Sequence, residues 1–171
     1  MNVEKRLIEG NQKFIQRIEK GNYKKEHLTN LVKGQNPFAM VITCSDSRVI
    51  PENIFSLEEG EIFVIRSAGN VINEGELASI EYGIEHLNIK YILVLGHTHC
   101  GAIHAAFHHE KGHYLSPILS KIERCLSSSE LETTKANALK QAKCIKEKFN
   151  HYDGTISSGI YDIETNKVEI F

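Results

Sequence analysis

The sequence predicts an α/β fold: a mostly parallel central β-sheet flanked by helices, with an N-terminal helix and a C-terminal strand pair. Three short, nearly continuous apolar runs at 37–44, 61–66 and 91–96 are typical of strands buried on both faces. Apolar residues at helical spacing over 76–87 lie between the last two runs. This strand–helix–strand alternation favours parallel strands joined by right-handed crossovers.

The elements outside this centre follow from local patterns. Residues 3–20 have apolar side chains close to helical spacing, which is broken near Gly10, and this pattern predicts an amphipathic N-terminal helix. A polar stretch follows and ends as a loop at 34–37. Beyond residue 100 the pattern is helical, through about 101–110, 116–127 and 132–149. The segment 155–171 predicts two strands around a turn at 164–167.

Length and composition describe an ordinary globular protein. The chain has 171 residues, no internal repeat and no low-complexity stretch, so we expect a single domain over 1–171. A formal net charge of -2 gives no sign of a nucleic-acid partner. No apolar run approaches a membrane span, and the N-terminus lacks an apolar signal region. We therefore expect a cytoplasmic protein without a membrane partner.

The four cysteines fall into two kinds. Cys44 and Cys100 lie among acids, glycines and histidines, whereas Cys125 and Cys144 lie in ordinary helical sequence. A cytosolic chain of this size does not need disulfides. We interpret the first pair as functional and the second pair as packing or surface thiols.

Two motifs follow buried strands and carry the chemistry. Cys44, Asp46 and Arg48 alternate directly after the first strand, so in extended backbone their side chains would face one pocket. His97 and Cys100 follow the third strand and would share a face if a helix begins there. Sites in open parallel sheets form at the carboxyl ends of strands, so we expect the two motifs to meet.

Cys44, His97 and Cys100 are suitable zinc ligands, and three ligands leave a fourth position for water, as in catalytic sites. Asp46 is placed to orient a zinc-bound hydroxide, with Arg48 holding its carboxylate ionised and correctly turned. Each motif alone is weak, because a strand-end cysteine usually only packs and an Asp-x-Arg pair is usually a surface salt bridge. Their combination at two adjacent strand ends is far more specific.

A histidine-rich stretch follows Cys100. Its members are His99, His104, His108, His109 and His113. His104 and His108 are four apart on an expected helix and could bind a metal. We see no carboxylate or cysteine that completes a set there. A solvated helix face is favoured, with a proton relay as the alternative.

The sequence resembles the β-class carbonic anhydrases. The resemblance is carried by CSDSRVIPENIF, GEIFVIRSAGN, SIEYGIEHL and ILVLGHTHCGAI, which begin at residues 44, 60, 79 and 92. It is strong over about 35–105 and weaker outside. Ser67 departs from the asparagine that is common in the family, and the chain is shorter than many members.

The resemblance implies one zinc per subunit, bound by Cys44, His97 and Cys100, with Asp46 and Arg48 as the catalytic dyad. In some members this aspartate becomes a fourth zinc ligand, so both roles stay open for Asp46. By the same resemblance, Gln35 and Tyr82 are substrate-binding residues. Members are homodimers or dimers of dimers with sites near the subunit boundary, and the N-terminal helix is expected to pack on a partner subunit.

The activity implied is zinc-dependent, reversible hydration of carbon dioxide to bicarbonate and a proton, through a zinc-bound hydroxide. Two alternatives stay open. Carbonyl sulfide or carbon disulfide hydrolases resemble this family and share its ligands, and pocket shape decides between these substrates. Ser67 and the short chain motivate the other alternative, a non-catalytic zinc-binding module.

Overall fold

The computed structural model describes residues 2–21 and 25–171, which form two compact units, Met1–Gln35 and Asn36–Phe171. The first unit contains α1 (Val3–Glu19) and α2 (Lys25–Lys33). The expected N-terminal helix is confirmed, and α1 continues through Gly10, where the apolar spacing is broken. A Cβ at Gly10 would meet nothing within 4 Å, so this glycine costs the helix only about 1 kcal/mol relative to alanine. Helix α2 was not predicted.

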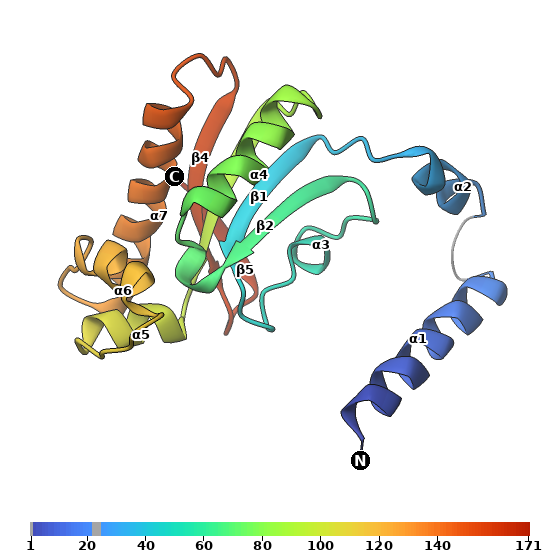
Figure 1. The fold of residues 1–171 in the computed structure, drawn as a ribbon, viewed down its shortest axis with the longest axis horizontal. Helices are drawn as coiled ribbons and strands as arrows, with labels where there is room; N and C mark the ends of the chain where they lie inside the picture. Colours follow the sequence, from blue (N-terminus) through green and yellow to red (C-terminus); the bar gives the residue numbers. More distant parts are fainter. Residues whose placement is uncertain (1, 22–24) are drawn as a thin grey trace. The chain divides into compact units, whose positions relative to one another are not determined.

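The second unit is built on a five-stranded sheet of order β2-β1-β3-β4-β5 (Figure 1). The first four strands in this order pair in parallel, and β5 runs antiparallel to β4, which confirms the predicted fold class and the C-terminal strand pair. The strands are β1 (Ala39–Cys44), β2 (Ile62–Ser67), β3 (Tyr91–His97), β4 (Thr155–Asp162) and β5 (Lys167–Ile170).

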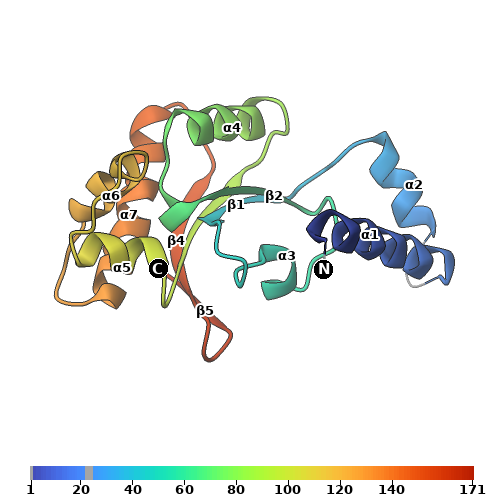
Figure 2. The same cartoon turned by 60° about the horizontal axis from the view of Figure 1, so that its bottom comes forward.

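Helices cover both faces of the sheet. In Figure 2, α4 (Glu74–Glu85) lies above the sheet and the short α3 (Pro51–Ile54) lies below it. Side chains alternate accordingly: Met40 and Ile42 enter the core under α4 and α7 (Glu130–Lys148), whereas Val41 enters the core on the other face. The apolar runs are therefore continuous because both faces are buried.

The register brings the carboxyl ends of β1 and β3 together. Thr43 pairs with Leu95, and the Thr43 hydroxyl donates to the Leu95 carbonyl at 2.8 Å. Two shorter helices follow β3, α5 (Gly101–Phe107) and α6 (Ser116–Glu123), and each ends a few residues before its expected end. Among residues 2–21 and 25–171, no helix has the length and apolar character needed to cross a bilayer.

Candidate metal centre

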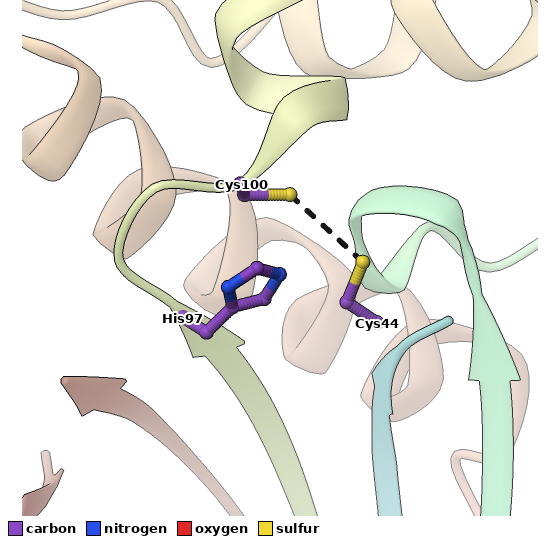
Figure 3. Close-up of side chains that lie close together, drawn as sticks. All are labelled: Cys44, His97 and Cys100. Atoms are coloured by element: carbon purple, nitrogen blue, oxygen red, sulfur yellow. Dashed lines mark hydrogen bonds between the residues drawn. The ribbon is translucent and has the colours of Figure 1, made fainter. Parts of the chain in front are cut away.

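Three side chains at the carboxyl edge of the sheet form a group able to hold a metal ion. Cys44 ends β1, His97 ends β3, and Cys100 directly precedes α5. One ligand atom from each lies within 4.8 Å of the others, and all three residues are buried. Figure 3 shows both sulfur atoms and the imidazole ring turned toward one another. Cys125 and Cys144 lie outside this group.

His97 and Cys100 converge through a tight turn rather than along one helix. Helix α5 begins only at Gly101, so the expected shared helix face does not exist. The backbone reverses at His99, whose φ of 56° lies in the left-handed region that few non-glycine residues adopt. The Thr98 N–H donates to the Tyr161 carbonyl of β4 at 3.0 Å and anchors the turn to the sheet.

The imidazole of His97 is oriented to bind a cation. Its Nδ1 lies 2.8 Å from the Thr98 carbonyl, and because a carbonyl can only accept, Nδ1 carries the proton. Its Nε2 is buried, and within the described chain it has no hydrogen-bond partner. An unpartnered buried nitrogen costs free energy that a bound metal ion would offset.

The distance between the two sulfurs also fits zinc. Cys44 Sγ and Cys100 Sγ are 3.9 Å apart. Two thiolates on a tetrahedral zinc, each at about 2.3 Å, lie about 3.8 Å apart. The residues present therefore match a zinc ion in both donor type and spacing.

The two thiols titrate as a pair. The hydrogen bond from Cys100 is the main cause that lowers the pKa of Cys44, to about 4, and the Gly69 N–H also contributes. The pKa of Cys100 is raised, because its thiol hydrogen bonds to Cys44 and is buried beside that charge. The Cys44 thiol thus loses its proton readily, whereas the Cys100 thiol keeps its proton until a bound cation replaces it.

Asp46 and Arg48 form a bidentate pair beside this group. Arg48 Nη2 donates to Asp46 Oδ2 at 2.7 Å, and Arg48 Nε donates to Asp46 Oδ1 at 2.9 Å. These bonds hold the pKa of Asp46 well below its usual range. Asp46 Oδ2 lies 3.9 Å from His97 Nε2, and Arg48 Nη2 also donates to the His99 carbonyl at 3.0 Å. The dyad therefore connects the two motifs.

Supporting residues that the sequence did not single out lie behind the site. Arg66 Nη2 donates to the Asp46 carbonyl at 2.6 Å, and Arg66 Nε donates to the Cys44 carbonyl at 3.1 Å. The Gly69 N–H points at Cys44 Sγ at 3.3 Å, and the buried Asn137 Nδ2 donates to the Gly69 carbonyl at 2.8 Å. Arg66 and Gly69 belong to the segment GEIFVIRSAGN, whereas no local signal marks Asn137.

Of the two expected substrate-binding residues, only Tyr82 belongs to the same compact unit as the metal-binding group. Gln35 is exposed and is the last residue of the first unit. Tyr82 lies on α4, 46% exposed, with its ring against Phe63 and stacked on His86. Phe63 pairs with Met40, four residues before the strand end at Cys44, which is about 13 Å along the strand. Tyr82 is therefore not brought to the metal group of its own chain, and the role of both residues stays a prediction.

Comparison with known proteins gives concordant matches. A family model described as carbonic anhydrase matches residues 39–168. Carbonic anhydrase 2 of Mycobacterium tuberculosis is 45% identical over 103 residues, which are 60% of this chain and 50% of that protein. A carbonic anhydrase of Synechococcus elongatus is 45% identical over 108 residues, covering 58% and 38% of the two chains. The chain thus spans half or less of the length of these relatives.

Solved structures agree over nearly the whole chain. The β-carbonic anhydrase CcaA superposes with a TM-score of 0.83 and 30% identity, covering 99% of this chain and 95% of that one. The β-carbonic anhydrase CafA of Aspergillus fumigatus superposes with a TM-score of 0.87 and 24% identity, covering 99% and 91%. The second similarity concerns the fold alone.

Proposed function

The chain belongs to the β-carbonic anhydrase family, and from this premise we propose that it catalyses the reversible hydration of carbon dioxide to bicarbonate and a proton. One observation carries the proposal: a buried Cys–His–Cys group with an unpartnered imidazole nitrogen lies beside a carboxylate clamped by an arginine. A purely structural metal site has no need of such a dyad.

The proposed cofactor is one zinc ion per chain. Cys44 Sγ, His97 Nε2 and Cys100 Sγ would hold it. Zinc supplies Lewis-acid chemistry in such a site, because it lowers the pKa of a coordinated water toward neutrality. The two thiolates donate more negative charge than neutral imidazoles, so we expect activity to be favoured toward alkaline pH.

The chain's own residues would orient the attacking water. Asp46 is held ionised by Arg48, so its carboxylate can only accept a hydrogen bond or a proton. Its Oδ2 lies toward the metal group, and that position supports a role in fixing the orientation of the water. Ligation of zinc by Asp46 would compete with its hydrogen bonds to Arg48, so we favour the orienting role.

We propose that Tyr82 and Gln35 contact the substrate across a subunit boundary. Tyr82 packs against Phe63, whose strand partner Met40 lies about 13 Å along the strand from Cys44, and 46% of its surface is exposed. In this arrangement Gln35 would donate a hydrogen bond to carbon dioxide or bicarbonate. These two molecules are the proposed small-molecule partners.

Apolar surface left uncovered in the described chain supports a homodimer or a dimer of dimers. Several apolar residues of α1 are exposed, among them Val3 by 71% and Leu7 by 70%. On the second unit, an apolar cavity of about 240 Å³ is lined by side chains that include Phe38 and Ile170. Light scattering of the wild type should give a dimer or tetramer mass, and Leu7→Glu should lower it. A monomer at micromolar concentration would contradict this assembly.

The activity is tested by stopped-flow hydration of carbon dioxide with the zinc-loaded protein across pH 7–9. A rate equal to that of the buffer blank would refute it. Turnover of carbonyl sulfide should be measured in the same preparation. If kcat/KM is greater for carbonyl sulfide than for carbon dioxide, the alternative substrate is favoured. A zinc-loaded protein that is inactive on both would favour the non-catalytic module. A cytoplasmic location and the absence of a nucleic-acid partner stay predictions from the composition.

A further inference from the structure

The histidine-rich stretch contributes to a second group of metal-binding side chains. The expectation that no carboxylate completes a set at His104 and His108 is wrong, because Glu130 does so from the start of α7. Glu130 Oε1 lies 2.8 Å from His104 Nδ1 and 3.6 Å from His108 Nε2. One ligand atom from each of the three residues lies within 4.8 Å of the others.

The backbone holds these side chains in place. His104 and His108 are one helical turn apart, joined by the bond from the His108 N–H to the His104 carbonyl at 3.0 Å, and their ring centroids are 4.3 Å apart. The opposite face of α5 is buried through Ile103 and Ala106. Both views show α5 beside the N-terminal end of α7, where Glu130 lies (Figures 1 and 2).

The donor set selects a class of ion. Two imidazoles and one carboxylate suit borderline transition-metal ions such as Zn²⁺, Co²⁺ and Ni²⁺, whereas Mg²⁺ and Ca²⁺ prefer oxygen ligands alone. The side chains of His104 and His108 are 56% and 54% exposed, so an ion bound there would keep water ligands and exchange with solvent. No other pair of exposed histidines in the described chain joins a carboxylate in this way.

We propose that His104, His108 and Glu130 bind a divalent transition-metal cation, of which Zn²⁺ is the representative, in addition to the ion at Cys44, His97 and Cys100. The second ion would tie the last turn of α5 to the first turn of α7. Because α5 directly follows Cys100, such a link would restrain the position of α5 relative to the first site. The inference does not depend on the proposed activity.

The test is calorimetric titration of the full chain with ZnCl₂, after one zinc per chain has been loaded and confirmed by elemental analysis. The wild type should take up one further equivalent. His104→Gln and Glu130→Gln should each weaken this event about tenfold or more, and the double variant His104→Gln/His108→Gln should lose it. All variants should keep the first zinc, because none alters its ligands.

Two controls separate the triad from ordinary histidine–glutamate pairs. His151 lies 3.0 Å from Glu85, and His109 lies 3.7 Å from Glu123, each without a second imidazole in the group. His151→Gln and His109→Gln should retain the second equivalent. Added ZnCl₂ should also raise the unfolding midpoint of the zinc-loaded wild type more than that of the double variant. A wild type without a second equivalent, or a double variant that binds it unchanged, would overturn the proposal.

Discussion

Both carboxylate oxygens of Asp46 are bonded to the guanidinium of Arg48, at 2.7 and 2.9 Å. The Arg48 N–H also donates to Asp46 Oδ1 at 2.9 Å, and the same guanidinium donates to the His99 carbonyl beyond the β3 strand end. Arg48 therefore fixes the carboxylate in orientation as well as in charge. A planar bidentate donor does this in a way that a single ammonium group cannot.

Replacement of Arg48 should reduce hydration activity without releasing the metal. We expect Arg48→Ala to lower kcat/KM by about 10²-fold, because a carboxylate free to turn spends little time in the productive orientation. Arg48→Lys should recover only part of this loss, since lysine keeps the positive charge but cannot donate two parallel hydrogen bonds to the carboxylate. Stopped-flow rates measured at equal zinc content test the point. Full activity in Arg48→Lys would show that charge alone suffices.

Asp46→Asn distinguishes the two roles left open for this residue. If Asp46 accepts from the attacking water, the amide should lower kcat by about 10²–10⁴-fold while zinc stays at one per chain. If Asp46 is a zinc ligand, the variant should instead bind zinc more weakly. Elemental analysis after dialysis, together with the hydration rate, separates these results. The bidentate pair with Arg48 leads us to expect the first.

Gly69 should resist substitution. Its φ is +64°, and a Cβ there would lie 2.9 Å from Ile122 Cδ1 and 3.1 Å from Ala102 Cβ. Gly69→Ala should therefore cost about 1–3 kcal/mol in the free energy of unfolding. It should also weaken zinc binding, because the N–H that points at Cys44 Sγ would shift.

Gly75→Ala is the matched control for that change. Gly75 lies in α4, and a Cβ there would meet nothing within 4 Å. This variant should be neutral or more stable by up to about 1 kcal/mol, with unchanged zinc affinity. Urea denaturation of both variants measures the difference. Equal stabilities would mean that the backbone at Gly69 is not constrained as the structure indicates.

The convergence of Cys44, His97 and Cys100 could be predicted from the sequence because it depends on few assumptions. Cys44 and His97 end strands that buried apolar runs identify, and parallel strand ends meet at one edge of a sheet. The prediction that His97 and Cys100 share a helix face was wrong, because α5 begins only at Gly101. The turn through His99 at positive φ has no sequence signal that would distinguish it from an early helix start.

Contacts from α7 could not be predicted. Asn137 reaches Gly69 across 68 residues, and Glu130 reaches His104 across 26. Periodicity indicates that α7 is a helix, but it does not say which residues of α7 face which loop, because packing against β3 and β4 sets its position. For this reason the supporting network and the second metal group both require the structure.

Tyr152 should make stability depend on alkaline pH. Its hydroxyl is buried without a hydrogen-bond partner in the described chain, and burial raises its pKa from 10.0 to about 12. Between these two values the unfolded chain has lost the phenolic proton while the folded chain keeps it, so the free energy of unfolding falls as pH rises.

Tyr152→Phe removes both the ionisation and the unsatisfied hydroxyl. We expect its stability to match or exceed that of the wild type at pH 8, by about 1 kcal/mol at most. The difference in favour of the variant should grow as the pH is raised through 10 toward 12. Urea denaturation at stepped pH values measures this difference directly, and other groups that titrate in the range cancel between the two proteins. A difference independent of pH would show that the Tyr152 hydroxyl reaches solvent or a partner in the folded protein.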